Sequence, residues 1–148
     1  MKKILCLLSL VSLFATQLCA QSRWTDPQTG ISWTYTNNTD DTVSIGWYKK
    51  LNNIIVQGQY LDAISESTSG TITIPTEING KRVKSIRPLA FDGTFRIHLI
   101  IPQGIRLEEY ALAYSTMTSV TFLGTTSSDR NMFYSSEIGT ITFSQAQL

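Results

Sequence analysis

The chain has 148 residues and a formal net charge of +1, with 42% hydrophobic and 16% charged residues. This composition is typical of a folded globular domain and excludes a disordered, highly charged chain. A near-neutral charge without a basic run also lacks the electrostatic footprint of a nucleic-acid-binding protein, so we expect no nucleic-acid partner.

Residues 1–20 have the three-part pattern of a secretory signal peptide. Lys2 and Lys3 provide a basic start, and an apolar run follows at residues 4–15. This run has 12 residues, whereas a membrane-spanning helix needs about 20. We therefore expect cleavage near Ala20, a secreted, periplasmic or cell-surface location, and no transmembrane segment after processing.

Cleavage would change the chemistry of the chain. Cys6 and Cys19 would leave with the signal peptide, so the mature chain would have neither disulfides nor a thiol nucleophile. Acylation of Cys19 is the alternative, but lipoproteins need a small residue before the cysteine and Leu18 is not small. Loss of Lys2 and Lys3 would leave ten basic and eleven acidic residues.

Residues 21–69 are expected to form a β-rich cap with a hairpin. Polar and apolar residues alternate from residue 31 to residue 36 and again from residue 43 to residue 47, which predicts two half-buried strands with Trp33 and Trp47 in the core. The polar residues 37–41 between them favour a turn. Segments 54–56 and 60–64 are weaker strand candidates.

In residues 70–148, similar triplets and pairs of residues recur at a constant spacing along the sequence. This spacing, here called the step, equals that from Leu99 to Val120. The triplets that recur at this step are Leu99-Ile100-Ile101, Val120-Thr121-Phe122 and Ile141-Thr142-Phe143. The pairs that recur at the same step are Ala90-Phe91, Ala111-Leu112 and Met132-Phe133. One more triplet, Ile72-Thr73-Ile74, precedes Leu99 by more than one step, and the extra length fits an insertion with a turn at Asn79-Gly80.

A period of about 20 to 29 residues with one short strand per unit is typical of leucine-rich solenoids. We therefore predict a mainly β chain in which a short leucine-rich-repeat solenoid of about three to four units follows the β-hairpin-rich N-terminal cap. Leu99, Val120 and Ile141 should lie on neighbouring parallel strands and point inward. The Ala-Phe type pairs should fill the core on the returning side of each coil.

These residues resemble the BspA-type leucine-rich repeats of bacterial surface proteins. The matching positions are Ile74-Pro75, Val83 and Ile86, Ala90-Phe91 and Ile101-Pro102. The resemblance covers about residues 70 to 143 and weakens along the chain, where Phe122-Leu123 and Phe143-Ser144 stand in place of Ile-Pro. It implies a short, degenerate array and a role in adhesion or host contact.

Residues for catalysis are scarce, and we expect no enzyme, no cofactor and no metal site. His98 is the only histidine, and no nucleophile-elbow motif accompanies it. The paired carboxylates Asp40-Asp41 and Glu108-Glu109 are expected on the solvated surface. A calcium site at Asn37, Asp40 and Asp41 matches no calcium-loop spacing.

Binding is the expected role, with a protein partner or a surface glycan. The residues predicted to face outward from the repeat strands are Thr71 and Thr73, His98 and Ile100, Ser119 and Thr121, and Thr140 and Thr142. A carbohydrate-binding module that uses Trp47 and Tyr48 is the alternative, since one of these two neighbours should face outward. A third hypothesis is a structural subunit that self-associates through the C-terminal repeat edge.

Overall fold

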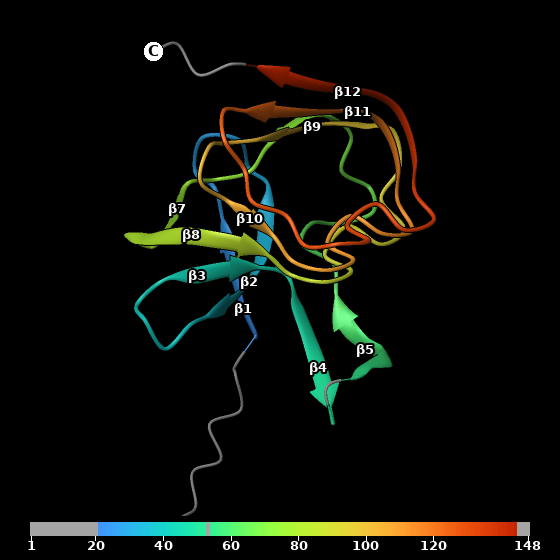
Figure 1. Cartoon of the computed structure of the whole chain (residues 1–148). Helices are drawn as coiled ribbons and strands as arrows, with labels where there is room; N and C mark the ends of the chain where they lie inside the picture. Colours follow the sequence, from blue (N-terminus) through green and yellow to red (C-terminus); the bar gives the residue numbers. More distant parts are fainter. Residues whose placement is uncertain (1–20, 53, 145–148) are drawn as a thin grey trace, which may run out of the picture.

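The computed structural model describes residues 21–52 and 54–144 of the chain. The predicted signal peptide at residues 1–20 lies outside the described residues, as do residues 145–148 of the predicted repeat region. The described part is mainly β and contains no helix (Figure 1). Its strands are β1 (Gln21–Thr25), β2 (Ser32–Asn37), β3 (Val43–Ile45), β4 (Trp47–Leu51), β5 (Ile54–Leu61), β6 (Gly70–Thr73), β7 (Glu77–Ile78), β8 (Lys81–Ile86), β9 (Ile97–Ile101), β10 (Arg106–Leu107), β11 (Thr116–Leu123) and β12 (Glu137–Ser144).

The strands form several sheets. One sheet has the order β1-β2-β3-β8-β10, with β7 paired to β8, and a second has the order β12-β11-β9-β6. β4 and β5 form a separate antiparallel ribbon. In Figure 1 the four-stranded sheet runs along the top of the molecule, β8 and β10 lie opposite to it, and the ribbon points away from both.

All pairings in the four-stranded sheet are parallel. Val120 is the partner of Leu99 on β9 and of Ile141 on β12, and Leu99 is the partner of Ile72 on β6. This confirms the predicted placement of Leu99, Val120 and Ile141 on neighbouring parallel strands. Leu99 and Val120 are fully buried, as predicted, whereas Ile141 on the edge strand is 42% exposed.

The insertion predicted before the second triplet is also visible. β7 and β8 form an antiparallel hairpin whose two-residue turn is Asn79-Gly80. Both residues have a positive φ, at 51° and 76°. Two successive positive φ values are typical of a type I′ turn, for which Asn-Gly is the preferred sequence. The predicted turn is therefore confirmed.

The corners between the strands recur at the same step as the strands themselves. Non-glycine residues with a positive φ are costly for the backbone and therefore mark defined corners. One set of corner residues with a positive φ is Leu89, Tyr110 and Asn131, and another is Gly93, Tyr114 and Ser135. Within each set the spacing equals that from Leu99 to Val120.

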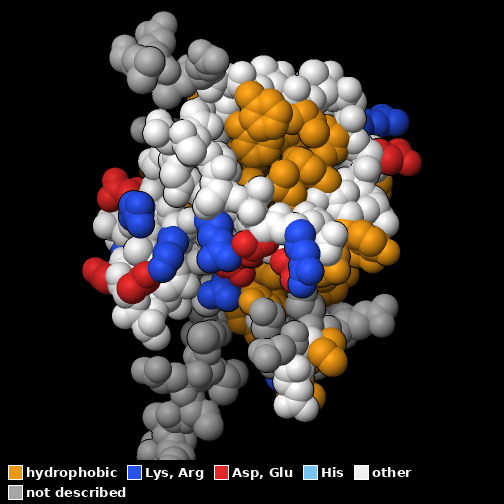
Figure 2. Space-filling model, viewed as in Figure 1, with side chains coloured by type: hydrophobic (Ala, Val, Ile, Leu, Met, Phe, Trp, Pro, Cys, Tyr) orange, Lys and Arg blue, Asp and Glu red, His pale blue; other side chains and the backbone are white. Residues whose placement is uncertain are grey.

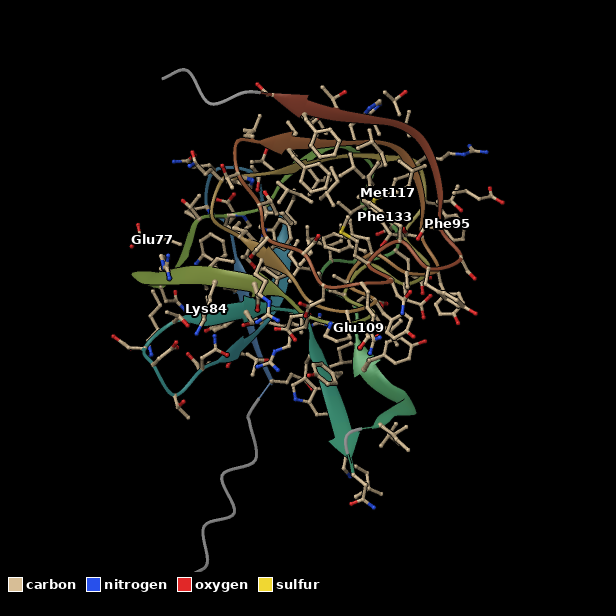
Figure 3. The ribbon with its side chains drawn as sticks, in the orientation of Figure 1. Glu77, Lys84, Phe95, Glu109, Met117 and Phe133 are labelled. Carbon is tan, nitrogen blue, oxygen red and sulfur yellow. The ribbon has the colours of Figure 1, made fainter. Side chains whose placement is uncertain are left out.

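The core lies between the four-stranded sheet and the sheet that contains β8. The predicted core pairs Ala90-Phe91 and Ala111-Leu112 are fully buried, whereas Met132-Phe133 is only partly buried. Met117 and Phe133 lie inside the ring formed by the strands and corners (Figure 3). Met132-Phe133 lies just before β12, which is an edge strand, and it is therefore less covered.

The N-terminal hairpin forms as predicted, but with different burial. β2 and β3 pair antiparallel, and β3 continues the sheet by pairing in parallel with β8. The predicted half-buried alternation of β2 is wrong, because Thr34 and Thr36 are 3% and 2% exposed. Other segments cover that face: the Thr34 amide donates to the Ala63 carbonyl, and the Thr36 hydroxyl donates to the Gly46 carbonyl.

The second hairpin strand ends earlier than predicted, at Ile45. Gly46 has a φ of 85°, and a Cβ at this position would lie 2.9 Å from the Ala90 Cβ. Only glycine therefore fits where the backbone passes Ala90. Trp47 begins β4 on the far side of this break, so its predicted place in the hairpin and in the core is wrong: its side chain is half-buried on the ribbon.

The two weaker strand candidates merge into one strand. β5 runs without interruption from Ile54 to Leu61 and pairs with β4. Ala63 and Ile64 lie beyond its end and are buried as loop residues. The Ala63 amide donates to the Ala90 carbonyl, which ties this loop to the first corner of the C-terminal half.

Candidate functional site

The four-stranded sheet presents the predicted outward-facing residues in two rows, which we call the outer ladder. One residue per strand contributes to each row, and the rows are Thr71, His98, Ser119 and Thr140, and Thr73, Ile100, Thr121 and Thr142. All eight are exposed or half-buried. The structure therefore brings together residues that are far apart in the sequence. None of them is an acid, a lysine or an arginine.

His98 takes part in this ladder through a cross-strand contact. Its Nδ1 lies 2.9 Å from the Ser119 Oγ, within hydrogen-bond distance. A catalytic triad would also need a carboxylate on the ring to orient it. Within residues 21–52 and 54–144, no hydrogen bond joins His98 to a carboxylate.

The predicted aromatic site is not part of the outer ladder. Trp47 and Tyr48 lie on β4 of the separate ribbon, and both are half-buried. As consecutive residues of one strand they point to opposite faces of the ribbon, and neither is fully exposed. The Arg87 guanidinium lies 5.4 Å from the centre of the Tyr48 ring, so a cation already stacks on this aromatic side chain.

The β12 edge of the four-stranded sheet exposes apolar side chains. Phe143 is 73% exposed and its ring stacks on Phe122 of β11, with 5.0 Å between ring centres. Together with Leu107 and Met132 these two rings line a shallow hollow of about 100 Å³. Figure 2 shows a hydrophobic patch close to β11 and β12 on the face in view.

A larger cleft lies on the sheet that contains β3, β8 and β10, and sequence reasoning missed it. Its volume is about 400 Å³. We call it the polar cleft, because its lining consists of Asn37, Asn38, Thr39, Asp40, Ser44, Lys84, Ser85, Arg87, Arg106 and Glu108. Lys84 projects from β8 on the side that faces away from the four-stranded sheet (Figure 3).

Parallel strand pairing builds the floor of the polar cleft. Ser85 on β8 is the partner of Ser44 on β3 and of Arg106 on β10. Ser44 and Ser85 are 2% and 4% exposed, and their hydroxyl oxygens are 2.9 Å apart. Buried hydroxyls need partners, and these two find them in each other and in the side chains beside them.

A chain of hydrogen bonds crosses this floor. The Arg87 guanidinium donates to the Asn38 Oδ1 at 3.2 Å, and the Asn38 amide donates to the Ser44 Oγ at 3.0 Å. The Ser85 Oγ lies 2.7 Å from the Glu108 Oε1. Glu108 and Ser44 are both acceptors within reach of the Ser85 hydroxyl, and its single proton favours the carboxylate, which is the stronger acceptor. The chain therefore runs from a guanidinium to a carboxylate.

Two charged groups on the rim of the cleft are neutralised by partners. Lys84 forms an ion pair with Asp40, and Arg106 forms one with Asp129 at 2.8 Å. The hydrogen bond from Lys84, followed by one from the Thr42 hydroxyl, lowers the pKa of Asp40 to about 2. The hydrogen bond to Asp129 stabilises the charged form of Arg106 and therefore raises its pKa. Figure 2 shows a band of basic and acidic side chains across this part of the surface.

Two other charged groups of the cleft, Arg87 and Glu108, are not neutralised in this way. Neither takes part in an ion pair between the described residues. The Nε of Arg87 is buried and has no hydrogen-bond partner in the described part of the chain. One carboxylate oxygen of Glu108 accepts from Ser85, which corrects the expectation that this residue is simply solvated.

One signal in the sequence could have located half of this cleft. Ile86 and Leu107 point inward and are one repeat step apart, so the residues before them, Ser85 and Arg106, must share the outer face. The other half could not be predicted in this way. Asn38 and Ser44 reach the cleft only because β3 pairs with β8, which lies far along the chain.

The described residues contain neither a metal-binding cluster nor a membrane-spanning helix. They contain no group of three or more His, Cys, Asp or Glu placed to hold a metal ion. No helix within the same residues is long and apolar enough to cross a bilayer. Comparison of the chain with protein-family models, curated proteins and solved structures found no match.

Proposed function

We propose that this chain is an exported bacterial binding protein without enzymatic activity. In this proposal, residues 21–69 form the cap of a short leucine-rich-repeat solenoid of BspA type, and three to four units follow it in residues 70–148. The outer ladder binds a protein partner, in adhesion or another contact at the cell surface. The common register of β9, β11 and β12 and the recurring corner residues support the repeat assignment.

The observation that carries the proposed function is the outer ladder itself. It is a continuous face of four parallel strands with six hydroxyl side chains, one histidine and one isoleucine. Such a face desolvates at low cost, because it carries no fixed charge that would lose its hydration on binding. Stacked repeats generally use an extended surface of this kind to bind partners.

The size of the face sets the expected affinity. Four strands about 4.8 Å apart and about five residues long cover a projected area of roughly 300 Å². A standard-size interface takes about 800 Å² from each partner. The partner must therefore also contact the borders of the sheet, and we expect a weak or transient complex when it does not.

Charge substitution in the ladder tests this proposal. Thr121→Lys places a cation at the centre of the face, and Thr25→Lys places one on β1 of the other sheet as a matched control. Immobilised wild-type protein and both variants would be exposed to fibrous matrix proteins and to cell-envelope proteins, with binding measured by surface plasmon resonance. A partner retained by the wild type and by Thr25→Lys should bind Thr121→Lys at least tenfold more weakly.

Equal binding by the three proteins would rule out the ladder as the contact surface. Circular dichroism spectra of the variants establish that the fold is intact. Because both substitutions introduce the same charge at an exposed or half-buried threonine, a general electrostatic effect would weaken both variants equally.

A structural role is the second candidate, and the β12 edge favours it. The exposed Phe143 and Ile141 would be covered if the edge strand paired with another copy of the chain. Glycan binding through Trp47 and Tyr48 receives less support, because both rings are half-buried and Arg87 already stacks on Tyr48.

A further inference from the structure

The lining of the polar cleft restricts the chemistry of a ligand. All ten lining residues have polar or charged side chains, so no hydrophobic side chain is offered to an apolar molecule. A volume of about 400 Å³ is at the small end of ligand sites. A ligand that fits must therefore be small and must form several hydrogen bonds. Sugars have this property, and the carbon stems of the lining side chains suit the apolar faces of a sugar ring.

Arg87 supplies the cleft with a positive charge and forms no ion pair with the other described residues. Its side chain is fixed from two sides, by the hydrogen bond to Asn38 and by the Tyr48 ring. Its buried Nε has no partner among the described residues. A guanidinium held in place in this way matches the two oxygens of a carboxylate.

Glu108 supplies the complementary acceptor. The bond from Ser85 occupies its Oε1, and no bond to its Oε2 is present among the described residues. An ionised carboxylate accepts hydrogen bonds only, so Oε2 suits the hydroxyl group of a sugar. The chain through Asn38, Ser44 and Ser85 holds this acceptor and Arg87 in one network, so that these side chains need little further ordering on binding.

From this arrangement we infer that the polar cleft is a second binding site, for a sugar that carries a carboxylate. Arg87 would bind the carboxylate, and Glu108 and Asn37 would bind ring hydroxyls. The cleft lies on a different sheet from the outer ladder. The site is therefore independent of the proposed protein contact, and either can fail while the other stands.

Calorimetric titration of the purified protein tests this site. The probes are N-acetylneuraminic acid, glucuronic acid and galacturonic acid, with glucose and N-acetylglucosamine as neutral sugars and acetate and inorganic phosphate as simple anions. We expect at least one acidic sugar to bind at least tenfold more tightly than every neutral sugar and every simple anion. Sialyllactose then distinguishes a terminal sugar on a glycan from a free monosaccharide.

Two variants and a matched control connect binding to the cleft. Arg87→Gln should weaken the binding of the acidic sugar at least tenfold, and Glu108→Gln should weaken it less. Arg130→Gln removes an arginine that pairs with Glu109 outside the cleft, and its affinity should stay within twofold of the wild type. If Arg87→Gln does not fold, amide chemical shifts of the wild type at Ser44 and Ser85 must respond to the acidic sugar instead.

Three results would overturn the inference. Binding of none of the acidic sugars would exclude the ligand class. Equal affinity for acetate or phosphate would reduce the cleft to a general anion site. Unchanged affinity in folded Arg87→Gln, or no shift at Ser44 and Ser85 in the wild type, would place the sugar elsewhere on the protein.

Discussion

Replacing Leu99 with alanine should lower the free energy of unfolding by about 3 to 4 kcal/mol. The substitution removes three buried carbon atoms, which corresponds to about 2.4 kcal/mol at about 0.8 kcal/mol for each. A cavity adds to this loss, because β6 and β11 hold the backbone on both sides and limit collapse. Leu99 is 0% exposed, so no solvent contact reduces the effect.

Ile141→Ala is the matched control, because it removes the same number of carbon atoms from the same row of the sheet. Ile141 is 42% exposed, and among the described residues its strand has a neighbour on one side only. It should therefore cost only about 1 kcal/mol, without a cavity term. Urea unfolding at room temperature, followed by circular dichroism, measures both values. Equal losses in the two variants would refute the stacked arrangement of these strands.

Two further predictions concern the pH dependence of stability and the edge strand. Burial, with smaller contributions from Asp92 and Glu66, raises the pKa of Asp62 from 3.8 to about 6. The folded state thus binds the proton of the Asp62 carboxyl group more tightly than the unfolded state. The stability that this protonation contributes is lost as the pH rises through about 6. Asp62→Asn should therefore raise the free energy of unfolding by about 1 kcal/mol at about pH 7.5, after allowance for solvent screening, and change it little at about pH 3.5. An equal increase at both pH values in urea titrations would contradict this cause. At high concentration the wild type should form dimers through β12 in sedimentation velocity experiments. The double variant Ile141→Lys, Phe143→Lys should remain monomeric, because lysine on an edge strand opposes pairing. A wild type that is monomeric at its solubility limit would exclude pairing through β12.

The four-stranded sheet could be predicted because similar triplets recur in the sequence at one spacing. Inward residues at the same spacing, such as Leu99 and Val120, occupy equivalent positions on neighbouring parallel strands. Alternation within each triplet then assigned Thr121 to the outer face. The turn at Asn79-Gly80 was predictable for a similar reason, since two residues alone specify it.

The predictions that failed depend on contacts between distant segments. Thr34 and Thr36 look like the solvent side of a strand, yet the loop at Ala63 and the backbone at Gly46 cover them. Trp47 continues the alternation of the hairpin, but the close passage of the backbone at Ala90 breaks the strand before it. Neither contact leaves a trace in local periodicity.

The sequence by itself determined the parallel ladder and the residues on its outer face, because similar triplets recur in it at a constant spacing. Only the tertiary structure decided where the N-terminal hairpin docks. Its pairing with β8 creates the polar cleft, in which Asn38 and Ser44 meet Ser85, Arg87 and Glu108. Such a site arises from one non-repeating contact between distant strands, and no local pattern of residues encodes it.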